Sequence, residues 1–313
     1  GGTLQVPVGD WPSGVYYVQL TDDTGRVGYA PLIVRPDRIG EHRVAVVLPT
    51  NTWQAYNRED LDGNGWGDTW YSGWVVMQVQ LGRHYQGWGM PPAFRRYDLP
   101  YLRWLQNRRH DVDYLTDSDL HALDSADTLT RAYDLIVFEG HTEYVSTHEY
   151  DLIERYRDHG GHLAYLTANN FFWRLTVHGR TITRTKQWRD LDRDESELIG
   201  GHYTTHNHGY APYVARHVED APWLFSGTGI HDGTKFLRGG NEIDQMTSRS
   251  PKGTKVLAEI PNLFGPGKTA QMTYYEKDGA KVFAAGAFTL AGCAMTPVGG
   301  KLLDNLWDHL ARR

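Results

Sequence analysis

The sequence has a single cysteine, Cys293, so it cannot contain an internal disulfide framework. It has no basic excess either: 32 Lys and Arg stand against 38 Asp and Glu, and nucleic acid is therefore not an expected partner. Its longest weakly apolar run, residues 282–295, is shorter than the roughly 20 residues that span a bilayer, and we expect no membrane association. No signal peptide is visible after the initial Gly-Gly, which favours the cytoplasm without excluding secretion.

A chain of 313 residues allows about two domains. We expect residues 1–38 to form an N-terminal β segment, because residues 16–20 and 27–34 have strand character around the turn residues 22–25. Such a segment is a hairpin or the remnant of a β-sandwich. Residues 39–313 then form an α/β domain. The 11 Trp and 19 Tyr are explained by packing, with stacking on a sugar or another planar ligand as the alternative.

The α/β domain is organised around a strand, a tight turn and a helix. Leu135–Phe138 is a short apolar run, which is typical of a strand buried on both faces of a parallel sheet. From Thr147 the apolar positions follow helical spacing until Gly160. The turn between strand and helix carries His141 and Glu143. These two titratable side chains are thus expected at the carboxyl edge of the sheet, where open α/β sheets bind ligands.

The same alternation continues on both sides and predicts an α/β fold with a mostly parallel sheet flanked by helices. Further strands are expected at residues 44–48, 112–115 and 162–166, a pair of strands at 271–275 and 281–285, and a closing helix at 302–310. Between residues 174 and 266 the pattern dissolves into Gly, Asp, His and Arg. We expect this stretch to be an insertion with short elements of its own that covers the active edge of the sheet.

Polar side chains follow three of the predicted strands. Tyr56 comes after the first strand, His141 and Glu143 after the central one, and Asn169 after the next. Because parallel strands end at the same edge, these residues are expected to converge. Taken singly, each has a bland explanation: a tyrosine is usually a packing residue, and a Glu two residues after a His usually lies in a solvated turn.

Four runs carry a resemblance to a known family: Val47 to Asn57 (Val-Leu-Pro-Thr-Asn-Thr-Trp-Gln-Ala-Tyr-Asn), Tyr97 to Leu105, Gly140 to Tyr144 (Gly-His-Thr-Glu-Tyr), and Gly160 through Asn170. They resemble the large (beta) subunit of N,N-dimethylformamidase and its relatives over residues 43–313, less closely in the insertion, where Gly240 to Asp244 is the best remnant. The resemblance implies a core similar to class I glutamine amidotransferases and a mononuclear ferric ion, Fe³⁺. By motif its ligands are Tyr56, Tyr97 and Glu143, while His141 and Asn169 match residues that assist catalysis. It also implies a small amide-like substrate and a small partner subunit, and a homo-oligomer is a further expectation.

The residue types agree with that chemistry. Two phenolates and one carboxylate carry three negative charges and balance a hard trivalent ion, whereas zinc more naturally draws His or Cys. Three protein ligands leave positions open for an amide carbonyl or a water. His141 could then move the proton, and Asn169 could donate to the developing oxyanion. The single thiol, Cys293, lies far from the turn and reads as a small buried residue, so a thiol mechanism is disfavoured.

Two further metal sites are candidates. A glycine-rich run places oxygen ligands at the spacing of a calcium loop, on Asp60, Asp62, Asn64 and Asp68. Tyr71, however, stands where such a loop has its bidentate Glu, and a plain turn is the alternative. The histidines at 202, 206 and 208 are candidates for a second metal site or for the lining of the pocket. Because glycines surround them, we favour a solvated loop.

The leading hypothesis is therefore an iron-dependent hydrolase that cleaves the carbon–nitrogen bond of a small, non-peptide amide. The first alternative is a different hydrolytic or redox activity on the same metal site, with a larger, carbohydrate-like substrate. The second is a binding module without catalysis, for a carbohydrate or small ligand, whose only metal is the calcium held by the run from Asp60 to Asp68. Family membership alone does not decide the substrate.

Overall fold

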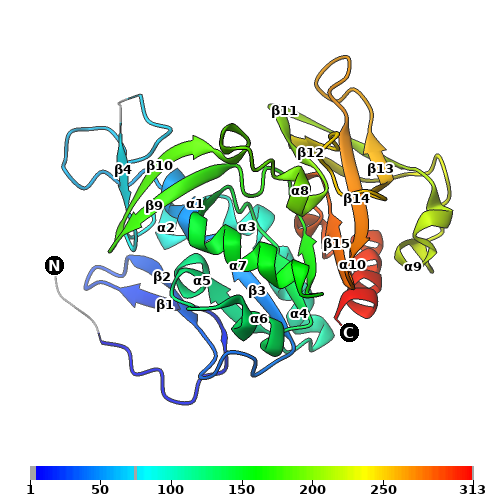
Figure 1. Ribbon diagram of the computed structural model, residues 1–313. Coiled ribbons are helices and arrows are strands. Elements are labelled where there is room, and N and C mark those ends of the chain that lie inside the picture. Colours follow the sequence, from blue (N-terminus) through cyan, green and yellow to red (C-terminus); the bar gives the residue numbers. More distant parts are fainter. Residues whose placement is uncertain (1–4, 74–75, 312–313) are drawn as a thin grey trace.

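The strands predicted around Leu135 form one end of a ten-stranded sheet in the computed structural model, which describes residues 5–73 and 76–311 (Figure 1). In sheet order the strands are β16 (Ala287–Phe288), β12 (Lys235–Gln245), β11 (His202–Ala215), β13 (Lys255–Ile260), β14 (Ala270–Lys277), β15 (Ala280–Ala284), β8 (His162–Tyr165), β6 (Leu135–Phe138), β3 (Val44–Leu48) and β5 (Asp113–Thr116). The run from β15 to β5 is parallel, and the strands beyond β15 are antiparallel. The predicted α/β class is confirmed, with an antiparallel extension of the sheet.

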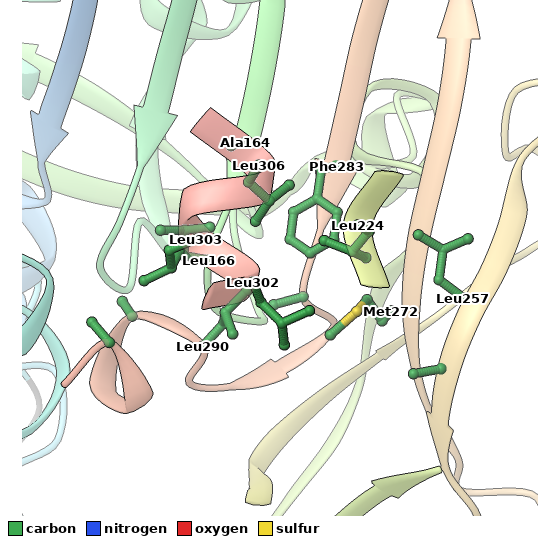
Figure 2. Close-up of a cluster of buried hydrophobic side chains, with 14 of the residues drawn as sticks. Ala164, Leu166, Leu224, Leu257, Met272, Phe283, Leu290, Leu302, Leu303 and Leu306 are labelled. Atoms are coloured by element: carbon green, nitrogen blue, oxygen red, sulfur yellow. The ribbon is translucent and has the colours of Figure 1, made fainter. Parts of the chain in front are cut away.

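Helices cover both faces of the parallel strands because each strand presents apolar side chains to both sides. In β3, Val44 and Val46 belong to one hydrophobic cluster, and Ala45 and Val47 to the other. Figure 2 shows Leu302, Leu303 and Leu306 of the C-terminal helix in the first cluster. The helices that cover the sheet are α4 (Leu99–Arg108) and α10 (Pro297–Leu310) on that face, and α5 (Asp117–His121), α6 (Ala126–Ala132) and α7 (Thr147–Asp158) on the other.

Short helical segments connect the strands. They are α1 (Thr50–Tyr56), α2 (Gln86–Gly89), α3 (Phe94–Tyr97), α8 (Ser196–Ile199), α9 (Pro222–Phe225) and the 3₁₀ turns η1 (Trp188–Leu191), η2 (Val218–Asp220) and η3 (Ala291–Cys293). No helix in the described ranges is both long and apolar enough to traverse a bilayer.

Two smaller sheets complete the fold. The predicted N-terminal hairpin is confirmed as β1 (Gly14–Thr21) paired with β2 (Val27–Val34), and residues 1–4 of that segment lie outside the described residues. The second is a four-stranded sheet of β4 (Gln78–Gln80), β10 (Thr181–Gln187), β9 (Trp173–His178) and β7 (Tyr144–Ser146). It was not foreseen, because β4 and β7 are each only three residues long.

The stretch from 174 to 266 contains longer elements than expected. The 14-residue β11 pairs along its length with β12, and β11 also pairs with β13, so these strands continue the main sheet. The pairing of β11 with β12 is interrupted by three register shifts, which mark β-bulges. These interruptions explain why the sequence pattern there did not indicate strands.

Helix α1 is held at its first turn by a buried carboxylate. Asp117 Oδ2 accepts hydrogen bonds from the Asn51 backbone N–H at 2.6 Å and from the Thr50 hydroxyl at 2.9 Å. Burial raises the pKa of Asp117 to about 7. Burial, together with the charge of Asp117, also raises the pKa of Glu149, which caps α7 through the Ser146 N–H. This buried carboxyl pair supports the helix that delivers Tyr56.

The pair should make stability fall as pH rises. Because the folded-state pKa values of both groups lie above their unfolded values of about 4, the stabilisation is complete below pH 4, and the part contributed by Asp117 is lost as pH rises through about 7. Asp117→Asn keeps an acceptor for Asn51 but removes one titrating group. The free energy of unfolding in urea should differ between pH 5 and pH 8 by about 1–2 kcal/mol less in this variant than in wild type. Asp127→Asn on the exposed side of α6 is the control, and an unchanged dependence in Asp117→Asn would contradict the expectation.

Candidate metal centre

Two hydrogen bonds, one from each neighbouring segment, hold the turn after β6 in place. The Glu143 backbone N–H donates to the Thr52 hydroxyl of α1 at 3.1 Å, and the Thr167 hydroxyl after β8 donates to the Gly140 carbonyl at 3.0 Å. A Cβ on Gly140 would lie 2.6 Å from Asp98 Oδ1, so only glycine fits there. The ends of β3, β6 and β8 therefore converge, as the strand order predicted.

Tyr56 and Glu143 meet directly. Tyr56 is the last residue of α1, and its hydroxyl donates to Glu143 Oε2 at 2.8 Å. Glu143 is only 3 % exposed. Burial raises the pKa of Glu143 to about 7, and burial together with the Glu143 charge raises the pKa of Tyr56 far above its ordinary range. Both groups are therefore in an environment that favours their protonated forms when no cation is bound.

His141 lies between two carboxylates. Its Nε2 is 3.5 Å from Glu143 Oε2 and 3.4 Å from Glu242 Oε2, yet it is buried and makes no hydrogen bond. Burial lowers the pKa of His141 to about 3, so the imidazole is neutral at pH 7. Burial and the nearby Glu143 charge raise the pKa of Glu242 well above its ordinary value. An uncharged imidazole between two carboxyl groups can move a proton between them and a ligand.

Asn169 forms a hydrogen bond with the Glu242 carboxylate. Its side-chain N–H donates to Glu242 Oε2 at 2.7 Å, and its backbone N–H donates to Asp244 Oδ1 at 2.9 Å. Asn169 has a left-handed backbone with φ of 54°, which these two contacts hold in place. Its Oδ1 is buried and has no hydrogen-bond partner. The expectation that Asn169 donates to an oxyanion stays a prediction, because one of its amide hydrogens is already engaged by Glu242.

A cavity of about 210 Å³ lies at the carboxyl edge of the sheet, and Glu143 and Asn169 lie behind the residues that line it. Tyr97, the last residue of α3, lines it together with Tyr56, His141 and Glu242. The rings of Tyr97 and His141 both contact Phe288 edge-on, with centroids 5.2 Å and 4.7 Å away. The remaining lining residues are largely apolar or uncharged: Thr52, Trp53, Pro92, Ala93, Asn241 and Phe288, with Asp98 as the exception.

The donor set fits a hard cation. Phenol and carboxylate oxygens are the ligands that such an ion prefers. Two buried carboxyl groups face this region, and the imidazole nitrogen between them lacks a hydrogen-bond partner, so the site contains polar atoms that a ligand would satisfy. The structure thus brings Tyr56, Glu143, His141 and Asn169 into one contact network and puts Tyr97 on the same cavity.

The candidate calcium loop lies on the surface. Asp60 accepts hydrogen bonds from the backbone N–H groups of Gly63 and Gly65. The side chains of Asp62 and Asn64 accept hydrogen bonds from backbone N–H groups within the run, and Asp68 accepts one from the Leu61 N–H. These hydrogen bonds are the ones that a glycine-rich turn makes within itself. A calcium role for Asp60, Asp62, Asn64 and Asp68 stays a prediction.

The three histidines do not gather. They lie on β11 rather than in a loop, and His206 and His208 are exposed. His202 instead pairs with Asp194 at 3.0 Å, and beside it Glu195 pairs with Arg189 at 2.6 Å. Asp194, Glu195 and His202 are the one group of three acidic, His or Cys side chains in the described residues that is close enough to share an ion. Because Arg189 already neutralises Glu195, ion pairing accounts for this group.

Sequence reasoning missed two residues of the centre. Glu242 was noted only as part of a weak motif, and Tyr71 only as a misfit in the calcium loop. The Tyr71 hydroxyl lies 3.3 Å from both Glu143 oxygens, and its ring stacks on Tyr56. The family-like run from Gly240 to Asp244 was a usable signal for Glu242, but nothing local indicated Tyr71. Cys293 is half-buried in η3, and burial raises the pKa of its thiol, as expected for a residue that is not a nucleophile.

Comparison with known proteins confirms the resemblance seen in the motifs. A family model described as "N,N-dimethylformamidase beta subunit-like, C-terminal" matches residues 2–298. The N,N-dimethylformamidase beta subunit of Paracoccus aminophilus is 29% identical over 155 residues, which are 48% of this chain and 18% of that protein. The subunit of the same name from Alcaligenes sp. is 32% identical over 123 residues, 38% of this chain and 15% of that protein. The matches thus span less than a fifth of the length of either relative.

Among solved structures, a beta-galactosidase from Bacillus circulans sp. alkalophilus superimposes with a TM-score of 0.50. The superposition covers 87% of this chain and 32% of that one, at 12% identity. At this identity the likeness concerns the fold alone.

Proposed function

This chain belongs to the N,N-dimethylformamidase beta subunit-like, C-terminal family, and we propose that it is a metal-dependent amidohydrolase that cleaves the carbon–nitrogen bond of a small amide. The proposed metal is a single ferric ion held by Tyr56, Tyr97 and Glu143. The observation that carries the proposal is the 2.8 Å contact of the Tyr56 phenol with the buried Glu143 carboxylate beside a cavity that Tyr97 also lines.

The charge balance supports this ligand set. Phenols have an ordinary pKa of about 10, so they bind as phenolates only when a strong Lewis acid displaces the proton. Two phenolates and one carboxylate then offset a trivalent charge inside a site whose burial otherwise disfavours ionised ligands. When bound, such an ion supplies Lewis-acid chemistry, polarising an amide carbonyl or acidifying a water.

The other residues of the cavity have separate roles in the proposal. Glu242 acts as general base toward the attacking water, because its carboxylate lines the cavity and is oriented by the Asn169 amide. The proton that Glu242 takes from the water then passes to the unpaired Nε2 of neutral His141, which transfers it to the departing amine nitrogen. Asn169 is the candidate for stabilising the developing oxyanion as well as for holding Glu242.

The cavity favours a small neutral substrate. Trp53, Pro92 and Phe288 give it apolar walls, and no Lys or Arg lines it among the described residues. A carboxylate-bearing amide would therefore have no cationic partner other than the metal. Small amides with alkyl groups on nitrogen match both the volume and the polarity of this space.

Assembly is a separate proposal. Both relatives are named beta subunits, and they are much longer than this chain. We propose that this chain, too, associates with a small partner subunit or with further copies of itself.

The first test is the metal content of the purified protein together with its visible absorption spectrum. Ferric tyrosinate gives a broad visible charge-transfer band, so about one iron per chain and a coloured protein are expected. A panel of formamides and acetamides with zero, one or two N-methyl groups then measures hydrolysis by amine release. A colourless protein that binds no iron after reconstitution, or that holds only calcium, would contradict the proposal and leave a binding module.

Removing the Tyr97 hydroxyl should release the iron. Tyr97→Phe keeps the ring contact with Phe288 but deletes one of the three proposed ligands. Ferric affinity should fall by more than about 100-fold, because even partners in the second coordination shell are commonly worth about 10–100-fold. The measurement is iron retained after dialysis against a chelator. Tyr16→Phe is the control, since that hydroxyl bonds the Pro12 carbonyl in the N-terminal region, and full iron in Tyr97→Phe would remove Tyr97 from the ligand set.

A further inference from the structure

A third phenol reaches the proposed ligands from a surface loop. Tyr71 belongs to residues 58–73, which we call the Asp60 loop. Although 38% of Tyr71 is exposed, its hydroxyl lies 3.3 Å from both oxygens of Glu143, which is 3% exposed. The hydroxyl also hydrogen-bonds that of Tyr144. Its ring stacks on Tyr56 with centroids 4.1 Å apart and planes inclined by 15°.

The protein core holds the loop in this position. Thr69, which is fully buried, donates its hydroxyl to the Ala55 carbonyl of α1. Arg83 donates to the carbonyls of Asp68 at 2.8 Å and Glu59 at 3.2 Å, so both ends of the acidic run are fixed. Trp70 packs against Tyr144 with ring centroids 4.9 Å apart. The direction of Tyr71 toward Glu143 is therefore determined by contacts of the residues that directly precede it.

The need for a second donor on Glu143 follows from the chemistry of the proposed ligands. A phenol that binds a metal ion does so without its proton. Tyr56 would then stop donating to Glu143 Oε2, the contact that orients this carboxylate in the metal-free protein. Tyr71 is not one of the proposed ligands and keeps its proton, so it can continue to donate to whichever Glu143 oxygen does not face the metal.

We propose that Tyr71 is a positioning residue for the ferric centre: its hydroxyl orients the Glu143 carboxylate, and its ring fixes the plane of the Tyr56 phenolate. This inference rests on the proposed function. It also gives the Asp60 loop a role that needs no calcium, because the loop carries Tyr71 into the site. Tyr71 points to Glu143, so it is not a substitute for the bidentate glutamate of a calcium loop.

The test compares two variants of Tyr71 with a matched control. Tyr71→Phe keeps the stacking on Tyr56 and removes the hydrogen bond, whereas Tyr71→Leu removes both. The control is Tyr274→Phe, since the Tyr274 hydroxyl also donates to a carboxylate, Glu276, but lines no part of the cavity. Ferric affinity is measured by chelator competition, and the visible charge-transfer band is recorded at saturating iron.

Tyr71→Phe should bind iron about 10–100-fold more weakly, at an unchanged stoichiometry of one per chain, and with a shifted band. Tyr71→Leu should be weaker still, because the Tyr56 ring loses its stacking partner. Unchanged affinity and spectrum in both variants would overturn the inference. Complete loss of iron from Tyr71→Phe at saturation would also overturn it, since Tyr71 would then be a ligand.

A second measurement separates this inference from the proposed function. Amide hydrogen exchange of residues 58–73 is followed in the metal-free wild type and Tyr71→Phe. Faster exchange in the variant is expected, because the loop loses its contact with Glu143. Equal exchange would contradict the contact between Tyr71 and Glu143 in the metal-free protein, on which the inference rests. A wild type that binds no iron would instead remove the proposed function, and with it the metal role of Tyr71, whatever the exchange result.

Discussion

Glu143→Gln should yield a folded protein that neither retains ferric ion nor hydrolyses amides. Glu143 is the group on which the proposed centre converges: it is contacted by the hydroxyls of Tyr56 and Tyr71 and approached by His141. The substitution preserves shape and a carbonyl oxygen but deletes one of three negative charges. Because Lewis-acid stabilisation is worth several kcal/mol, activity should fall on the order of 10³-fold or more.

This effect is measured by the iron content per chain, by the visible absorption band and by amine release from the amide of the panel that wild type hydrolyses fastest. Glu276→Gln is the matched control, since Glu276 also accepts a tyrosine hydroxyl, that of Tyr274. Folding is checked by thermal unfolding of the metal-free protein. Burial raises the pKa of Glu143 to about 7, so its ionisation costs stability as pH rises through that value, and the neutral variant should be no less stable at pH 8. A Glu143→Gln protein with one iron and wild-type activity would contradict the ligand assignment.

Glu242→Gln should separate metal binding from catalysis. Glu242 contacts His141 and Asn169 at the cavity, and none of its hydrogen bonds involves Tyr56 or Tyr97. The variant is therefore expected to keep its iron and its visible band. The loss of the base should lower kcat by about 10²- to 10⁴-fold, the usual contribution of general acid–base catalysis.

The kinetic constants and the iron content must be measured on the same preparation. Glu259→Gln serves as control, because Glu259 lies on β13, which β11 separates from β12, and pairs with Arg216 outside the cavity. Loss of iron in Glu242→Gln would make Glu242 a ligand instead of a base. An unchanged kcat would leave the water to be activated by another group.

The central strand and its turn could be predicted because their signals are local. Leu135–Phe138 is fully buried, and α7 begins at a capping box formed by Ser146 and Glu149, where the helical spacing also begins. His141 and Glu143 stand two positions apart in that turn, so their place at the sheet edge followed from chain order alone. Asn169 followed for the same reason, because it comes just after β8, and Tyr56 because it ends α1, the helix that follows β3.

The ligand set itself came from motif resemblance. Spacing does not tell whether Tyr97, 41 positions after Tyr56 in the printed sequence, faces the same cavity. The structure puts both residues on its wall, at the ends of the short helices α1 and α3. A four-residue helix such as α3 has too few turns to show a periodic pattern, so its direction could not be read beforehand.

The sequence by itself determined the parallel core, the convergence of three strand ends and the family. Tertiary structure alone decided that Glu242 and Tyr71 lie beside the proposed ligands. Glu242 arrives on β12, whose pairing with β11 is broken by bulges, and a bulge changes which face a side chain occupies. Tyr71 arrives on an irregular loop whose direction depends on Thr69 and Arg83 contacting distant backbone carbonyls. Such long-range contacts leave no period in the sequence, because they depend on how separate segments pack rather than on local spacing.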